Sequence, residues 1–203
     1  GDLSKWDVSR VADMPDMFWG ASMFNRNLST WNTSSIIGMH GIFSKTAVFN
    51  GDISKWDVSR VTDMGGVFRD AKSFNRDISN WDTSRVASTT YMFANAISFN
   101  GDLSKWEMSS VIDMAYMFSG AKAFNCDLSK WNVSKVEYMD YMFYHATSFT
   151  QTLCSAAWTN SATAQLAKLV FAGSRGSISV PAKSSQGCAR FVTYEDLQSA
   201  IDK

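Results

Sequence analysis

Large apolar side chains recur at one fixed interval along this chain of 203 residues and divide it into 25-residue units. Tryptophan fills one such column without a slip, phenylalanine fills two more, and Leu or Ile fills a fourth. The columns are Trp6, Trp31, Trp56, Trp81, Trp106 and Trp131; Phe18, Phe43, Phe68, Phe93, Phe118 and Phe143; Phe24, Phe49, Phe74, Phe99, Phe124 and Phe149; and Leu3, Leu28, Ile53, Ile78, Leu103, Leu128 and Leu153. Six uninterrupted units predict that every unit stacks on its neighbours in one fixed geometry.

The first half of each unit has the spacing of a strand. In one unit the apolar positions are Leu103, Trp106 and Met108. The Trp and the residue two places later point the same way only on an extended chain. We therefore predict a short strand over 105–108 and at the equivalent place in every unit.

The second half of each unit changes to a spacing of three or four. Val111, Met114, Phe118 and Ala121 would share one face of a short helix, with Ser109 as its N-cap. The first turns of these helices, where the helix dipole favours a negative charge, would hold Asp13, Asp63 and Asp113. Each unit is thus predicted to be a strand, a corner, a short helix and a return turn.

A short strand and a two-turn helix cannot bury their apolar faces alone, so the pattern predicts an α/β solenoid of stacked coils with parallel strands. Residues 1–149 would form six repeats and residues 150–174 a degenerate seventh, in which Val170 and Phe171 echo the Met-Phe pair. Residues 175–203 would cap the open end, with a short strand over 178–180 and a helix over 194–201.

Charge and composition exclude several classes of protein. Lys and Arg together number 19, as do Asp and Glu, so no global positive field points to nucleic acid or a membrane surface. No apolar run approaches the roughly 20 residues of a membrane span. The chain opens within a repeat and shows no signal peptide, so we expect a mature or trimmed product.

Two polar columns flank the tryptophans and should face solvent. Their charged members are the candidate binding residues, because solenoids present ligands on the strand face. They are Lys5, Asp7, Lys55, Asp57, Asp82, Lys105, Glu107 and Lys130. The alternative is a solvated face on which the two columns neutralise each other.

The other polar columns favour a structural role over chemistry. Asn and Ser recur after the return-turn Phe and around the strand, where both residue types bond local backbone groups. A serine nucleophile needs a base and an oxyanion site, which identical copies do not supply. A calcium site from Asp57 and Asp82 is an alternative, although no loop has metal-binding spacing. We expect no enzyme activity and no cofactor.

Three cysteines bear on the compartment. Cys154 and Cys188 both lie in the C-terminal region, and we expect a disulfide between them and hence an oxidising compartment; two reduced thiols are the alternative. Cys126 occupies a column otherwise held by Arg and Gly, so we expect it to be exposed. Glycosylation sequons begin at Asn27, Asn32 and Asn132, but serine columns in an Asn-containing repeat generate such matches by construction.

The string FNGDLSKWEMSSVIDMAYMF, residues 99–118, resembles a bacterial and algal surface-repeat family of unknown function that was first noted in mycoplasma lipoproteins. The resemblance covers residues 1–149, and extends to BspA-like leucine-rich repeats. Leu153, Cys154 and Trp158 resemble the C-terminal end of algal members. The resemblance implies a right-handed leucine-rich-repeat-like solenoid and, loosely, surface display, adhesion or protein recognition. It carries no catalytic residues.

The sequence therefore favours a secreted or cell-surface recognition module. It would bind a protein or a glycan through the strand face, without catalysis. The alternative is a structural subunit of a larger assembly, which would stack other subunits on its open N-terminal coil.

Overall fold

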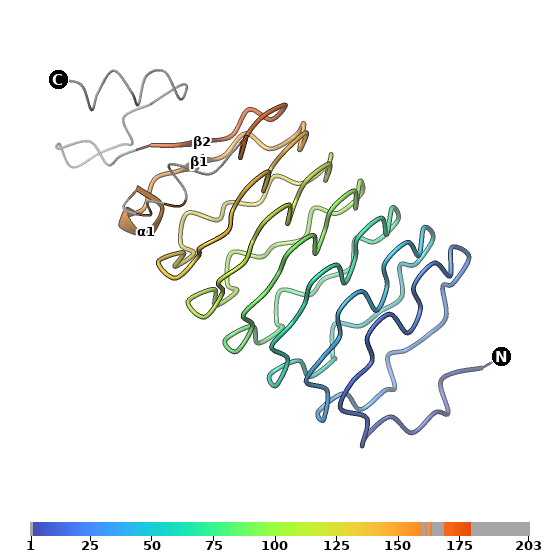
Figure 1. Cartoon of the computed structure of the whole chain (residues 1–203). Coiled ribbons are helices and arrows are strands. Elements are labelled where there is room, and N and C mark those ends of the chain that lie inside the picture. Colours follow the sequence, from blue (N-terminus) through green and yellow to red (C-terminus); the bar gives the residue numbers. More distant parts are fainter. Residues whose placement is uncertain (1, 160, 162, 164–168, 180–203) are drawn as a thin grey trace, which may run out of the picture.

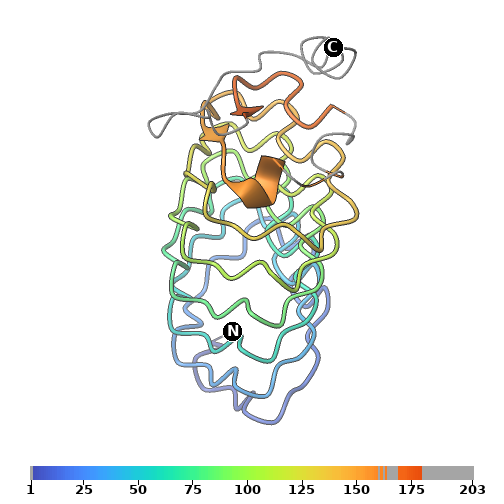
Figure 2. The same ribbon diagram turned by 90° about the vertical axis from the view of Figure 1, so that its left-hand side faces the viewer.

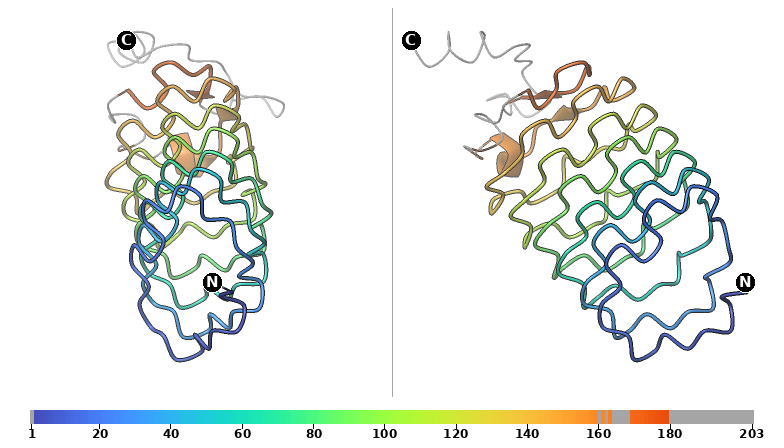
Figure 3. Two further views of the ribbon diagram at one scale, coloured as in Figure 1. Left: turned by 90° about the vertical axis from the view of Figure 1, so that its right-hand side faces the viewer. Right: turned by 45° about the vertical axis from the view of Figure 1, so that its right-hand side comes forward.

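The computed structural model describes residues 2–159, 161, 163 and 169–179. The chain winds into an elongated stack of similar coils, with the N-terminal coil at one end and residues 169–179 at the other (Figure 1). Views from the two sides show the coils lying over one another in register along the whole stack (Figures 2 and 3). Parallel bridges between residues 25 positions apart show that each coil stacks on the equivalent part of the next.

Regular secondary structure is scarce in the described residues. Near the C-terminal end, strand β1 (Thr152–Leu153) pairs in parallel with β2 (Ser177–Ile178), and helix α1 (Ala156–Thr159) follows β1. Elsewhere, single parallel bridges join each coil to the next, in the order Asp13, Gly38, Asp63, Ser88, Asp113 and Tyr138. The parallel pairing therefore lies in the second half of each unit.

The predicted helix after Ser109 is wrong, and so is the N-cap. Residues 115–120 form consecutive turns, and Tyr116 and Gly120 have φ values of 58° and 68°, which a right-handed helix does not allow. The N–H groups of Met117 and Ser119 donate to carbonyls three residues back, whereas those of Tyr116 and Gly120 donate to the next coil. The apolar spacing of three or four comes from successive tight turns.

This stretch of each unit, residues 12–20 and its equivalents, is called the ladder segment below. Alternate N–H groups donate to carbonyls of the next coil, as from Met14 to Gly38 (3.0 Å) and from Asp16 to His40 (2.8 Å). The apolar positions predicted from the spacing, in this segment and directly after it, are buried: Met114, Phe118 and Ala121 are all inaccessible to solvent. Burial was therefore predicted correctly and backbone geometry was not.

The strand predicted over 105–108 is also wrong. Residues 104–105 form a turn, and residues 106–108 have no regular structure and belong to no strand or bridge. Here the coils are joined by side chains. Each indole N–H donates to the Leu or Ile carbonyl of the preceding coil, as from Trp81 to Ile53 (3.2 Å) and from Trp106 to Ile78 (3.1 Å). This bond repeats from Trp31 to Trp158.

A third contact between coils runs through the asparagines of the return turn. The side-chain oxygen of each Asn accepts the backbone N–H of its equivalent in the next coil, at 2.9–3.0 Å. The chain of bonds passes through Asn25, Asn50, Asn75, Asn100, Asn125 and Thr150. The structural role expected for this column is confirmed.

Aromatic rings fill the space between these three sides. The ring of Phe68 stacks on Phe43 (5.8 Å between centroids) and on Phe93 (5.5 Å), and lies 3.8 Å from Phe74 of its own coil. Its centroid also lies 6.1 Å from that of the Trp81 ring, so the residues around each tryptophan and the ladder segment line different sides of one core. Offset stacking of this kind adds about 0.5–1.5 kcal/mol per pair to the free energy of burial.

The seventh unit keeps these contacts despite its altered length. Trp158, in α1, donates to Leu128 (3.0 Å), and Phe171 stacks on Phe143 at 5.3 Å. The extra residues before Trp158 are absorbed around α1. Strand β2 (Ser177–Ile178) overlaps the strand predicted over 178–180, and Ser179 within that range donates its N–H to Leu153. Val180 and the predicted 194–201 helix lie outside the described residues. The cap and the right-handed leucine-rich-repeat-like class stay predictions.

Replacing Trp81 with Phe should destabilise the stack. The ring volume is largely kept, but the buried carbonyl of Ile53 loses its donor, which costs about 1–3 kcal/mol. Trp6→Phe is the matched control, because Trp6 is 52% exposed and Trp81 only 3%. Urea unfolding followed by circular dichroism should show a lower midpoint for Trp81→Phe only. Equal midpoints for the two variants would mean that the indole bond adds nothing.

Candidate functional site

The predicted binding residues all lie on the surface beside the buried tryptophans. The side chains of Lys5, Lys55, Lys105 and Lys130 are exposed, as are those of Asp7, Asp57, Asp82 and Glu107. Their exposure matches the sequence-based expectation. This surface is called the tryptophan face below.

The carboxylates of the tryptophan face are already engaged by their own coil. Asp57 accepts the backbone N–H of Ser59 (3.0 Å) and its hydroxyl (2.7 Å), and Glu107 accepts the N–H of Ser109 (3.0 Å). Such bonds close a local turn around the acidic residue. The acidic half of the predicted surface therefore has a structural task, which leaves the lysines as its free charges.

A second set of these turns lies five residues earlier in each coil. Asp52 accepts the N–H and hydroxyl of Ser54 at 3.0 and 2.7 Å, and Asn27 accepts the N–H of Ser29 at 2.9 Å. We anticipated the serines as partners of the backbone but missed the acidic residue that orders them. The signal was present in the sequence as Asp, Asn or Glu followed two places later by Ser, twice in every unit.

These hydrogen bonds lower the pKa of the carboxyl groups that accept them. Bonds from the hydroxyl and N–H of Ser84 lower the pKa of Asp82, and bonds from Ser9 do the same for Asp7. Asp52, Asp77 and Asp102 shift in the same direction through their own serines. Each of these bonds favours the ionised form.

The positions of the ladder segment outside its Met and Phe columns form a different kind of surface, on which Ser44 and Ala94 are buried and the other side chains are at least partly exposed. Here the repeat is loose: four neighbouring columns change from coil to coil, whereas the tryptophan column never changes. This ladder face comprises Pro15, His40, Gly65, Thr90, Ala115 and Asp140; Asp16, Gly41, Gly66, Tyr91, Tyr116 and Tyr141; Trp19, Ser44, Arg69, Ala94, Ser119 and Tyr144; and Gly20, Lys45, Asp70, Asn95, Gly120 and His145.

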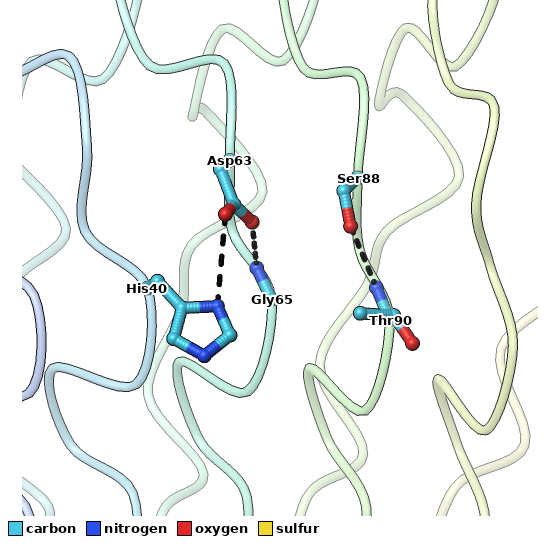
Figure 4. A network of polar contacts seen from close by, with 5 residues as sticks. All are labelled: His40, Asp63, Gly65, Ser88 and Thr90. Atoms are coloured by element: carbon cyan, nitrogen blue, oxygen red, sulfur yellow. Dashed lines mark hydrogen bonds and ion pairs between the residues drawn. The ribbon is translucent and has the colours of Figure 1, made fainter.

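Polar contacts on the ladder face occur both between adjacent coils and within one coil. His40 lies against Asp63 of the next coil, with 3.6 Å between Nδ1 and Oδ2, while the other oxygen of Asp63 accepts the N–H of Gly65 (Figure 4). One coil further on, Ser88 accepts the N–H of Thr90 in the same position (Figure 4). Both partners of the His40 pair are half exposed, so the pair contributes at most about 1 kcal/mol to stability.

Glycines on the ladder face make room for side chains of the preceding coil. A Cβ atom on Gly65 would meet the His40 ring, and one on Gly120 would meet the amide oxygen of Asn95. The pairing explains why His and Gly, or Asn and Gly, occur together at these columns.

Two columns of the ladder face adopt a left-handed backbone in every coil. In the column of Gly20 the φ values are 54–72°. In the column of Asp16 they are 53° at Asp16, 61° at Gly41 and 62° at Gly66, then 55°, 58° and 58° at three tyrosines. A bulky residue in this region costs about 1 kcal/mol or more relative to glycine. The three tyrosines, Tyr91, Tyr116 and Tyr141, therefore occupy a position where glycine fits with less strain.

The two glycines interrupt this row and leave a hollow of about 190 Å³ on the ladder face. On one side Lys45 lies over the ring of Trp19 (4.5 Å), and on the other Arg69 lies over the ring of Tyr91 (4.9 Å). The ring of Trp19 is 54% exposed. The lining residues are Asp16, Trp19, His40, Gly41, Ser44, Gly66, Arg69, Thr90 and Tyr91.

The hollow thus combines one exposed aromatic ring, a guanidinium group, an imidazole and a carboxylate. Sequence reasoning missed it because no single repeat contains it: four consecutive coils all contribute to its lining. The available signal was the variation among repeats in otherwise regular columns.

The cysteines and a possible metal site are the other candidates that the sequence offered. Cys126 is a free thiol that is half-buried, not exposed as predicted, with its sulfur 3.3 Å from the backbone nitrogen of Leu103; burial raises the pKa of this thiol. Cys188 lies outside the described residues, so its disulfide with Cys154 stays a prediction. Within the described part of the chain no group of three or more His, Cys, Asp or Glu side chains is placed to hold a metal.

Comparison with known proteins places most of the chain in one family. The family described as "Mycoplasma protein of unknown function, DUF285" matches residues 1–102 and, in a second overlapping match, residues 76–177. No curated protein and no solved structure matches the chain. In the part of the chain that the structure describes, no helix is long and apolar enough to cross a membrane.

The lowered pKa values predict how stability depends on pH. A carboxyl group whose pKa is lower in the folded chain adds stability above its ordinary pKa, and this is lost as the pH falls through the folded value. The urea midpoint should therefore be flat near neutrality and fall below about pH 4.

Replacing Asp52, Asp77, Asp82 and Asp102 with Asn should reduce the fall of the urea midpoint at acidic pH, because Asn27 and Asn32 hold the same turns without a charge. Urea midpoints measured from neutral to acidic pH give the comparison. If the urea midpoint of the fourfold variant falls as steeply with decreasing pH as that of the unmodified chain, these carboxyl groups do not cause the loss of stability in acid.

Proposed function

The chain belongs to the DUF285 family, and we propose that it is a non-catalytic recognition module that binds a protein or glycan ligand through its ladder face. The observation that carries this proposal is the hollow between Trp19 and Arg69, where the otherwise regular stack gathers unlike polar and aromatic side chains. A rigid array with variable outward residues is how solenoid proteins build binding surfaces.

The size of the hollow indicates what part of a ligand it would accept. Pockets for whole small molecules measure roughly 300–1,000 Å³, and this one is smaller. It suits one ring-sized group of a larger ligand, such as a single side chain or sugar unit. The exposed face of Trp19 would stack on that group, while His40, Asp16 and Arg69 would bond its polar edge.

The tryptophan face is the less favoured surface for the same function. Its acidic residues are held by their own serines, and its lysines share one column with Thr30 and Asn80. Lys5, Lys55, Lys105 and Lys130 would supply a general electrostatic attraction rather than a shaped site. A calcium site at Asp57 and Asp82 has no third ligand in the described residues.

The finer sequence-based assignments stand as part of the proposal. We infer a relationship to BspA-like leucine-rich repeats, a secreted or cell-surface location, and no nucleic-acid partner. The balanced charge of the chain and the match to DUF285 support these inferences. Stacking of other subunits on the first coil stays the alternative function.

The experiment that tests the ladder face is to fill the hollow. Gly66→Tyr continues the row of tyrosines that the next coils already carry, and the nearest atom beyond the chain neighbours lies 3.9 Å from the Cβ position at Gly66. Binding to a panel of defined oligosaccharides and to a displayed peptide library should fall roughly tenfold or more, since blocking a pocket that anchors a ligand removes about 2 kcal/mol.

Gly66→Ala is the matched control, because it imposes the same left-handed backbone cost and leaves the hollow open. A second control replaces Lys5, Lys55, Lys105 and Lys130 with Gln. If Gly66→Tyr binds as tightly as the unmodified chain while the lysine variant loses binding, the tryptophan face is the site. If the unmodified chain binds neither class of ligand, assembly through the first coil becomes the better proposal.

A further inference from the structure

Three tyrosines on the ladder face are held in a stack that extends over three coils. The ring centroids of Tyr91 and Tyr116 are 4.5 Å apart with planes 7° from parallel, and those of Tyr116 and Tyr141 are 4.8 Å apart at 12°. The backbone fixes this spacing, because the N–H of Tyr91 donates to Ala115 and that of Tyr116 to Asp140, both at 2.9 Å. The rings cannot separate unless the coils separate.

The choice of residue at this column is itself informative. All three tyrosines have φ values of 55–58°, in the region where the equivalent Gly41 and Gly66 are less strained. Buried aromatic columns of this chain use Phe, which outnumbers Tyr by 14 to 6, but this half-buried column uses Tyr in three consecutive coils. Stacking alone does not require a phenol, whereas oxidation chemistry does.

We propose that Tyr91, Tyr116 and Tyr141 form a site of oxidative cross-linking, at which a peroxide-driven one-electron oxidant joins neighbouring coils through a dityrosine bond. This modification does not depend on the ligand proposed above. It would convert a non-covalent stack into a covalent one on the outer surface of the protein.

Coupling of one pair of tyrosines consumes one molecule of hydrogen peroxide. Each phenol gives up one electron and one proton, and the two phenoxyl radicals join through a carbon–carbon bond between ring positions next to the oxygens. The hydrogen on each of these carbons then moves to the adjacent oxygen and restores both aromatic rings. The two electrons and two protons reduce one molecule of hydrogen peroxide to two of water.

The geometry favours coupling within the chain. At these centroid distances the carbons of adjacent rings lie close to van der Waals contact, so a radical on one ring meets its partner without diffusion. Burial, and then the neighbouring Tyr91 and Tyr141, raise the pKa of Tyr116, so this side chain is a neutral phenol at physiological pH. Tyr144 meets Tyr141 edge-on at 84°, which does not align the rings in this way.

The test is oxidation of the folded chain by a haem peroxidase with hydrogen peroxide, followed by trypsin digestion and mass spectrometry. Cleavage after Arg85, Lys105 and Lys122 places Tyr91 and Tyr116 on separate peptides that contain no other tyrosine. We expect these two peptides to be joined, with a mass two hydrogen atoms below their sum, and dityrosine fluorescence in a chain that still migrates as a monomer under denaturing conditions.

Tyr116→Phe keeps an aromatic ring in the stack but removes the central phenol, so the internal link should disappear. Tyr138→Phe is the matched control and should leave the yield unchanged, because Tyr138 is 57% exposed and stands outside the stack. Oxidation in concentrated urea should also abolish the link between the two peptides. The proposal is overturned if the peptides are not joined, if Tyr116→Phe gives the same yield, or if only cross-links between chains form.

Discussion

The structure depends on backbone hydrogen bonds that no coil can complete by itself. In each ladder segment, alternate N–H groups find their acceptors in the next coil. An unpaired buried N–H costs about as much as several good contacts contribute, so a single unit is not a stable structure. The indole bonds and the asparagine bonds repeat the same arrangement on the other two sides. A unit therefore folds only when it stacks on its neighbours, and the fixed period of the repeat follows from this requirement.

The same constraint separates the structural residues from those that can vary. A tryptophan must reach the preceding carbonyl, and an asparagine must reach the next N–H, so these columns are uniform. The outward positions of the ladder segment pair mainly through their backbone, and in some coils also through a side chain, as from the Thr90 hydroxyl to the carbonyl of Ala115. Their side chains are free to differ, and unlike groups meet across coils, as His40 and Asp63 do. A surface of this type can be altered for a ligand without changing the core.

Surface sites on such a stack form mainly where side chains of different repeats meet. The hollow requires the rings of two different coils and two intervening glycines, and the tyrosine stack requires three consecutive coils. One repeat read alone shows only a Gly or a Tyr at an ordinary position. The charges beside the tryptophans are visible within one repeat, which is why they stood out in the sequence, although half of them serve to close turns.

The amino-acid sequence is enough to predict the period, the number of uninterrupted units and the identity of the buried columns, because a repeated apolar spacing leaves few ways to remove those side chains from water. It did not determine the backbone path. A spacing of three or four describes a helix and a run of tight turns equally well, and residues such as Tyr116 are helical only if φ is negative. Contacts with the next coil decided in favour of turns, since they offered acceptors to N–H groups that a helix would have kept. The tertiary structure likewise decided which polar columns gather into a site, because that proximity crosses a whole repeat at every step and leaves no local pattern.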